Sequence, residues 1–387
     1  MRPFVLPTVV AFAIAAACGS AAAHTPQDTG AVRDTTRTHA SPSAGAVDST
    51  SPIVRALYLN RWRAQSWPAM EHYIAIADST EINAFVIDMK DEFGLNYKTA
   101  NKDFARNGGT AGKVPNLKAL LDTLHAHNIL AIARIVVFKD SVTARVHPEW
   151  TIRKADGSPW QDKQGLTWVN PYEHALWDYN IGVAEELVKL GFGEIQFDYI
   201  RFPEPYTSLP PQVFPHSKGI QKPDVLAAYL KEAHSRISPL GVRTTADVFG
   251  FVATDRGPLE VGQWWEKLAP EVDVLLPMLY PSHFPRGSLG IEHPNAEPYN
   301  TIKISLDSAR FRDSVLHIVT PEHVRPWIQA FTLPGGKPYY GPEQIKQQKQ
   351  AVYDAGYDGW VLWSAGSKYD QFIPAFEKTL ESRKKKN

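Results

Sequence analysis

The 387-residue chain has a single cysteine and no net charge, because 41 Lys and Arg residues balance 41 Asp and Glu residues. One cysteine cannot form a disulfide within the chain, and a neutral balance gives no electrostatic reason to expect a nucleic-acid partner. The chain also lacks a P-loop, a Gly-x-Ser-x-Gly elbow and a Gly-x-Gly-x-x-Gly after its first strand-like segment. His125 and His127 would face different sides of a helix, which disfavours a zinc site. Nothing here indicates a metal, a cofactor or a protein partner.

Long apolar runs are missing too, apart from residues 5–17. With Arg2 before it and small residues after it, this run predicts an export signal over residues 1–23 that is too short to span a membrane. Cys18 follows Ile-Ala-Ala-Ala and precedes Gly-Ser, a pattern typical of a lipidated cysteine, which would tether the protein to a membrane. The alternative is cleavage after residues 21–23 by ordinary signal peptidase. Either way we expect an extracytoplasmic protein, whether membrane-anchored, secreted or periplasmic.

Residues 24–52 contain mostly Thr, Ser, Ala, Pro, Asp and Gly, with hardly an apolar side chain larger than Val. Such a segment cannot bury enough surface to offset its conformational entropy, so we predict a disordered linker. The folded domain should then occupy residues 53–382.

The folded region alternates short apolar segments with helical patterns. The expected strands lie near residues 55–60, 83–90, 129–138, 195–203, 244–250, 272–280, 326–331 and 359–363. The segments that follow them are 69–79, 117–127, 171–190, 224–237, 262–268, 299–312, 342–355 and 369–382. Eight such units in this length predict a single (β/α)8 barrel of the α/β class, and near-continuous apolar strands are typical of a parallel sheet. An open, doubly wound sheet in two domains is the alternative.

Several strand-to-helix segments are long and rich in Pro, Gly, Trp and His, which is how a cleft is built at the carboxyl ends of barrel strands. The polar or aromatic residues expected at those ends are Asp88, Lys90, Arg134, Asp198, Arg201, Asp247, Tyr280, Gln329 and Trp363. In a barrel, residues at this edge carry the chemistry.

Two of these residues suit glycoside hydrolysis, which needs one ionised and one protonated carboxyl group across the scissile bond. Arg201 could keep Asp198 ionised, although an Asp three residues before an Arg is also a common salt-bridged strand end. Asp247 lies between Ala246 and Val248, an apolar setting that would raise its pKa and suit a general acid.

Other carboxyl groups remain candidates for the acid. Asp88 is one of them, and Asp91 and Glu204 are weaker ones. Asp88 fits equally well as the partner of Lys90 or Arg134 in an ion pair beneath the site.

Several motifs in order resemble a bacterial family of glycoside hydrolase-like (β/α)8 domains, distantly similar to α-amylase-like and α-galactosidase-like barrels. The motifs are residues 83–91 (NAFVIDMKD), 168–171 (WVNP), 197–203 (FDYIRFP), 246–250 (ADVFG), 278–283 (MLYPSH), 294–299 (PNAEPY) and 359–363 (GWVLW). The resemblance covers residues 53–375. It implies that Asp198 is the nucleophile of a retaining mechanism. It implies an acid either from strand five, which is Asp247, or from strand six, where Tyr280 stands instead of a carboxylate.

We therefore expect an exported hydrolase that cleaves a polysaccharide or a cell-envelope glycan, with Asp198 and Asp247 as catalytic residues. The expected sugar-binding residues are Asp88, Lys90, Arg134, Trp168, Arg201, Tyr280, His283, Gln329 and Trp363. The same residues could serve transglycosylation, and a non-catalytic glycan-binding lipoprotein on the same scaffold is the alternative from another class.

Overall fold

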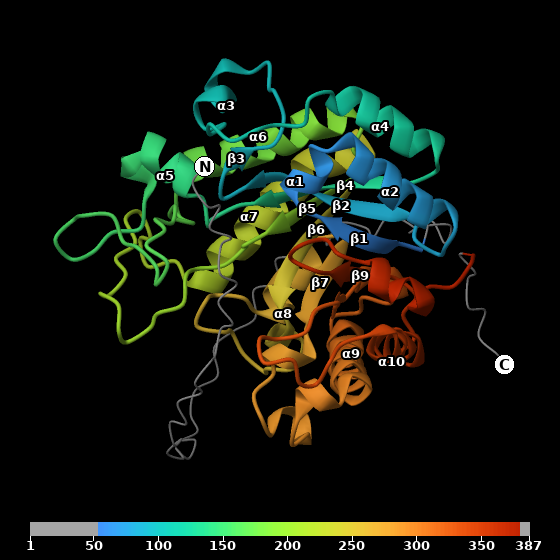
Figure 1. Cartoon of the computed structure of the whole chain (residues 1–387). Coiled ribbons are helices and arrows are strands. Elements are labelled where there is room, and N and C mark those ends of the chain that lie inside the picture. The colour runs from blue at the N-terminus through green and yellow to red at the C-terminus, as the bar shows by residue number, and fades with distance from the viewer. Residues whose placement is uncertain (1–52, 380–387) are drawn as a thin grey trace, which may run out of the picture. The chain divides into compact units, whose positions relative to one another are not determined.

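The computed structural model describes residues 53–379, so the predicted signal peptide, Cys18 and the predicted linker lie outside the described residues. Eight parallel strands form the centre of the domain: β1 (Arg55–Leu59), β2 (Ala84–Asp91), β4 (Leu130–Val136), β5 (Glu194–Asp198), β6 (Arg243–Phe249), β7 (Val274–Leu279), β8 (Trp327–Gln329) and β9 (Trp360–Trp363). Each strand pairs with the next, and β1 pairs with both β2 and β9, so the sheet is closed. The predicted (β/α)8 barrel is confirmed and the open sheet is wrong (Figure 1).

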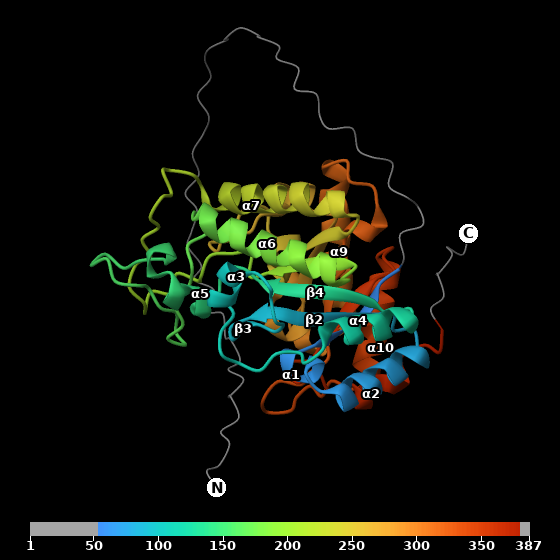
Figure 2. The ribbon, with the colours of Figure 1, turned by 90° about the horizontal axis from the view of Figure 1, so that it is seen from above.

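Helices cover the outside of the barrel, as the two ribbon views show (Figures 1 and 2). They are α2 (Trp67–Asp78), α4 (Leu117–Ala126), α6 (His174–Leu190), α7 (Lys222–Ile237), α8 (Trp265–Leu268), α9 (Pro298–Val315) and α10 (Pro342–Asp354). Short elements in the strand-to-helix connections are α1 (Arg61–Ala64), β3 (Gly94–Leu95), α3 (Lys102–Arg106) and α5 (Ser141–Val146). None of the described helices is long and apolar enough to cross a membrane.

Three predicted element bounds were wrong. The fourth strand ends at Asp198 and not near residue 203, because Tyr199 has a φ of 54° and turns the chain out of the sheet. The helix expected over 262–268 is reduced to the single turn of α8, since Gly262 adopts a φ of 88°. The expected closing segment over 369–382 contains a 3-10 helix, Asp370–Ala375, with Pro374 inside it, and its last residues lie outside the described part.

Alternate residues of the strands supply two cores. Side chains such as Leu57 and Phe85 belong to the layer shared with the helices, whereas Ala56 and Val86 belong to the barrel interior. Burial on both faces explains why the strands read as nearly continuous apolar runs.

The two ends of the barrel differ in chemistry. At the amino-terminal end, Glu194 is fully buried and pairs with Arg325 at 2.6 Å and with Arg243 at 3.2 Å. Such a closed ion-pair cluster at this end serves stability, and the carboxyl ends of the strands are where a barrel holds its active site.

Candidate active site

Asp198 ends β5 and lies beside Arg134 of the neighbouring strand β4. The register pairs Val136 with Asp198 and Asp88 with Arg134. Arg134 donates from Nε to Asp198 Oδ2 at 3.0 Å and from Nη1 to Asp88 Oδ1 at 2.5 Å. One guanidinium group therefore bridges carboxylates from the strands on either side of it.

The cation beside Asp198 is therefore Arg134 and not Arg201, which corrects the prediction. Arg201 pairs with Glu204 at 3.2 Å and donates to the Phe202 carbonyl at 3.0 Å. Its guanidinium lies 5.0 Å from the ring centroid of Trp168.

Asp88 is held by donors on both oxygens. In addition to Arg134, the Tyr58 hydroxyl donates to Asp88 Oδ2 at 2.5 Å. Burial raises the pKa of Asp88, while Arg134 and Tyr58 oppose that rise by stabilising the charged form. Of the two roles left open for Asp88, its contacts fit the ion pair that positions Arg134. Tyr58 was missed because an aromatic residue in an apolar strand reads as core.

Asp247 of β6 has one oxygen that accepts hydrogen bonds and one that has no hydrogen-bond partner among the described residues. Its Oδ1 accepts hydrogen bonds from Gln196 Nε2 and from Trp327 Nε1, both at 2.7 Å. Its Oδ2 is buried and has no hydrogen-bond partner among the described residues. Burial, together with the nearby charge of Asp198, raises the pKa of Asp247 well above its usual value. Because two obligate donors occupy Oδ1, the proton of neutral Asp247 belongs on Oδ2.

Gln196 was missed by the sequence reasoning, yet a signal for it existed. It precedes Asp198 by two residues in the same strand, and residues two apart in a strand share a face. Trp327 could not be found in this way. It lies on a strand far away in the sequence, and the sequence does not show which carboxylate its indole N–H would contact.

Asp198 and Asp247 occupy neighbouring positions on adjacent strands. The β5–β6 pairing ends at Phe197 and Ala246, and the two aspartates are the next residues on each strand. Adjacent strands lie about 4.8 Å apart, so the two carboxyl groups share one small region at the carboxyl end of the barrel.

Aromatic rings border this region on the side of β7 to β9. Tyr280 stacks on Trp363 with ring centroids 5.4 Å apart, and Phe331 meets Trp363 edge-on at 5.1 Å. Tyr58 stacks on the same indole at 6.4 Å. Burial, with the charges of Asp247 and Asp198, raises the pKa of Tyr280 well above its usual value, so its phenol is a neutral hydrogen-bond donor. The exposed His283 lies 5.3 Å from the Tyr280 ring.

Lys90 lies away from the site, contrary to the prediction. It is completely buried and pairs with Asp140 at 2.6 Å, with its ammonium 5.5 Å from the ring of Tyr179 in the outer helix α6. The cause is an irregularity between Asp88 and Lys90 in the pairing of β2 with β4, which breaks the alternation of faces.

Two further residues predicted to bind sugar, Gln329 and Trp168, form hydrogen bonds with other residues of the chain. The amide of Gln329 is fully buried, accepts from the Ser282 N–H at 3.0 Å and donates to the Phe331 carbonyl at 2.9 Å, so it fixes the loops that carry His283 and Phe331. Trp168 is also buried and donates to Asp162 Oδ2 at 2.9 Å, behind Arg201.

The weaker acid candidates have partners of their own. Asp91 pairs with the buried Arg61, and burial, with the charge of Asp88, raises the pKa of Asp91 to about 7. Glu204 pairs with Arg201.

The described residues form no group of three or more His, Cys, Asp or Glu side chains that could hold a metal ion.

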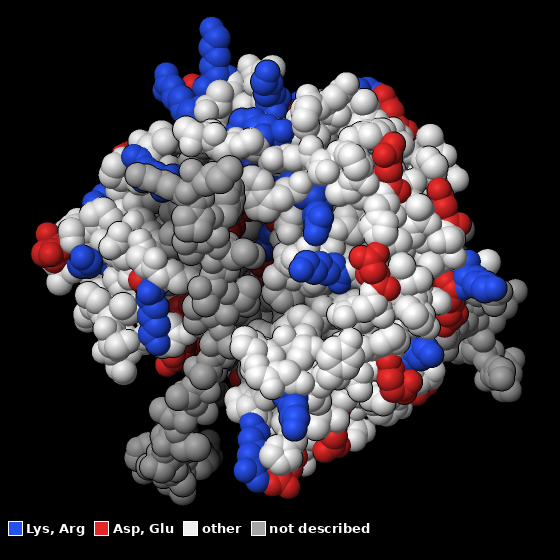
Figure 3. Space-filling model, in the orientation of Figure 1, with Lys and Arg blue, Asp and Glu red and all other residues white. Residues whose placement is uncertain are grey.

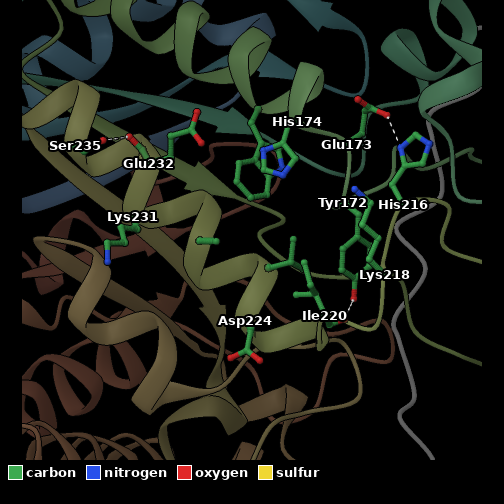
Figure 4. A pocket seen from close by; sticks show the side chains of 13 residues that line it. Tyr172, Glu173, His174, His216, Lys218, Ile220, Asp224, Lys231, Glu232 and Ser235 are labelled. Carbon is green, nitrogen blue, oxygen red and sulfur yellow. Dashed lines mark hydrogen bonds and ion pairs between the residues drawn. The ribbon is translucent and has the colours of Figure 1, made fainter. Parts of the chain in front are cut away.

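The described residues also form a groove of about 800 Å³ between α6 and α7, lined by residues such as His174, His216, Asp224 and Glu232 (Figure 4). This groove lies on the outer helices and includes none of the aspartates at the strand ends. Basic and acidic side chains are interspersed on the face drawn in Figure 3.

Residues 56–369 match the model of the DUF4015 family, which is described as "Putative glycosyl hydrolase domain". The chain belongs to this family. The match takes in every strand of the barrel from Ala56 onward, including Asp88, Arg134, Asp198 and Asp247. The family supports a glycan-hydrolysing role for the domain. None of the curated proteins matches the chain.

Two solved structures, with TM-scores above 0.5, share the fold. The glycoside hydrolase domain of PgaB (BpsB) from Bordetella bronchiseptica is 14% identical, with a TM-score of 0.62, and the match covers 86% of this chain and 100% of that domain. Alpha-L-fucosidase isoenzyme 2 from Paenibacillus thiaminolyticus is 15% identical with a TM-score of 0.54, covering 84% of this chain and 48% of the fucosidase. A hypothetical protein from Ruminiclostridium thermocellum is 36% identical with a TM-score of 0.45, covering 50% of this chain and 97% of that one.

Proposed function

We propose that the protein is an exported hydrolase that cleaves glycosidic bonds of a polysaccharide or a cell-envelope glycan, with Asp198 as nucleophile and Asp247 as general acid. The observation that carries the proposal is the pairing of unlike carboxyl groups on adjacent strands. Asp198 accepts a hydrogen bond from a guanidinium, whereas Asp247 is buried, has a raised pKa and has one oxygen without a hydrogen-bond partner among the described residues. When the surroundings of two carboxyl groups give them different pKa values, the group with the higher pKa suits the acid and the other suits the nucleophile or base.

The first step transfers the sugar from its leaving group to the enzyme. Asp247 gives its Oδ2 proton to the glycosidic oxygen while a carboxylate oxygen of Asp198 bonds to the anomeric carbon and the C–O bond breaks. In the second step Asp247, now a carboxylate, takes a proton from water, and the resulting oxygen displaces Asp198 from the sugar. The position of the two aspartates on adjacent strands, each one residue beyond the Phe197–Ala246 pair, favours this retaining route, because inverting enzymes need about 6.5–9.5 Å between carboxyl groups for an intervening water.

The residues around the pair have distinct roles in this proposal. Arg134 orients Asp198 and is itself fixed by Asp88. The neutral phenol of Tyr280 and the exposed imidazole of His283 are placed to donate to sugar hydroxyls, and Trp363 offers a partly exposed ring to a sugar face. Arg201 is held by its cation–π contact with Trp168 and would bind a sugar at the rim of the site.

Asp247→Asn tests the assignment of the acid. Asparagine keeps the hydrogen bonds from Gln196 and Trp327 but cannot donate a proton, so hydrolysis of an alkyl glycoside should fall by about 10²–10⁴-fold. The loss should be much smaller for aryl glycosides with acidic phenols, which leave without protonation.

The pH profile provides an independent readout of the same variant. The raised pKa extends the pH range over which Asp247 is protonated, so wild-type activity should fall as the pH rises through that pKa. In Asp247→Asn this alkaline limb should be absent. If Asp247→Asn keeps the alkaline limb of the pH profile, or loses as much activity on aryl glycosides as on alkyl glycosides, Asp247 is not the general acid.

We also propose export and lipidation, which rest on the sequence of residues 1–23 alone. The expected result of Cys18→Ala is that the protein moves from the detergent phase to the aqueous phase in a phase-partition experiment on bacterial membranes. If wild type and variant both stay aqueous, the chain is cleaved by ordinary signal peptidase and carries no lipid.

A further inference from the structure

Two exposed aromatic side chains lie together at the rim of the barrel, in connections that start at the carboxyl ends of β1 and β2. Trp62 in α1 is 52% exposed, and Phe93 between β2 and β3 is 43% exposed. Their ring centroids are 5.7 Å apart. α1, which carries Trp62, and β3, which begins one residue after Phe93, lie near each other in both ribbon views (Figures 1 and 2).

The backbone beneath these rings is fixed by buried charges. Arg61, which is 1% exposed, pairs with Asp91 and donates to the Gly112 carbonyl at 3.0 Å. Asp91 also accepts the Phe93 N–H at 2.9 Å, so one carboxylate ties both loops together. The Arg61 guanidinium lies 5.6 Å from the Trp62 ring and 5.5 Å from the Phe93 ring.

The arrangement leaves ring faces available to a ligand. The ring planes are inclined by 59°, so neither ring covers the face of the other as it would in a parallel stack. Leaving two large aromatic side chains exposed costs hydrophobic stabilisation, and an exposed pair above a hydrogen-bonded backbone at a site rim indicates a binding surface.

We propose that Trp62 and Phe93 form a stacking platform for a sugar ring of a polysaccharide, beyond the bond that is cleaved. The platform follows the same two strands that carry Tyr58 and Asp88, so a chain leaving the catalytic region over β1 and β2 meets these rings. The apolar faces of pyranose rings match rigid aromatic surfaces. The inference rests on the proposed function and adds that the substrate is a polymer which occupies several sites along the rim.

The test is affinity electrophoresis of the full chain in gels that contain soluble starch, laminarin, glycol chitin or purified bacterial cell-wall glycan. Trp62→Ala/Phe93→Ala should lose most of the retardation of wild type, with the Kd for the polymer rising about tenfold. The matched control is Phe311→Ala, since Phe311 is 68% exposed and lies near the carboxyl end of α9, toward the opposite end of the barrel.

Each outcome separates the platform from the proposed function. Equal retardation of wild type and double variant, or no retardation of wild type in any gel, overturns the platform even if glycosides are hydrolysed. Retardation of wild type that the double variant loses, without any hydrolysis by wild type, keeps the platform and rejects the hydrolase. A change in sedimentation of the double variant without polymer would show that a second copy of the chain covers the rings, which overturns the proposal.

Discussion

Asp198→Asn should reduce hydrolysis by roughly 10⁴-fold or more, the scale of loss seen when an enzyme nucleophile is removed. Asparagine can keep the hydrogen bond from Arg134 or the one from the Tyr199 N–H but not both, because they end on different oxygens of Asp198, and its amide oxygen cannot displace a glycosidic leaving group. The measurement is the initial rate on an aryl glycoside that wild type cleaves, with far-ultraviolet circular dichroism to show that the variant is folded.

The matched control is Asp307→Asn, because the Asp307 side chain is 51% exposed on α9 and pairs only with its helix neighbour Lys303 at 2.5 Å among the described residues. It should keep wild-type activity. A second variant, Asp198→Ala, opens space at the nucleophile position, so added azide should restore turnover and yield a glycosyl azide. Activity of Asp198→Asn close to that of wild type would refute the assignment of Asp198.

Arg134→Met should lower the free energy of unfolding by about 3–5 kcal/mol at neutral pH, because removing one partner of a buried ion pair leaves the other uncompensated. Two carboxylates, Asp88 and Asp198, lose their shared cation at once. Without the guanidinium, only the Tyr58 hydroxyl opposes the effect of burial on Asp88, so the folded-state pKa of Asp88 rises further. The deficit should therefore be largest above that pKa and shrink as falling pH protonates the carboxyl groups. Urea denaturation at several pH values measures it.

Arg236→Met is the matched control for this prediction. Arg236 also bridges two carboxylates, Asp178 at 2.8 Å and Glu185 at 2.9 Å, but its side chain is 31% exposed on the outer helices. Solvent screens such a bridge, so the expected loss is at most about 1 kcal/mol. Equal losses in the two variants would contradict the view that Arg134 holds the catalytic carboxylate in place.

The barrel could be predicted from the sequence because its elements repeat. Parallel strands buried on both faces read as short apolar runs, and each run ends in a polar residue before the chain loops toward a helix. That pattern also brought Asp88, Arg134, Asp198 and Asp247 to one edge of the sheet. The short strand β8 was found in the same way.

The contacts within the site could not be predicted, since they depend on which way each side chain faces. A local irregularity in β2 turns Lys90 toward α6 and leaves Arg134 as the cation beside Asp198. The positive φ of Tyr199 carries Arg201 away from the strand and toward Glu204. Buried on both faces, a parallel strand has no polar alternation that would reveal such shifts.

The central claim is that the Asp198–Asp247 pair hydrolyses glycosidic bonds. Its most direct test is the release of reducing ends from α- and β-linked aryl glycosides and envelope polysaccharides by the full chain, beside Asp198→Asn and Asp247→Asn. We predict cleavage by wild type that both substitutions suppress, with a first product that keeps the anomeric configuration of the substrate. No cleavage by any of the three proteins, with equal binding of one glycan by all of them, would contradict the claim and identify a non-catalytic glycan-binding protein.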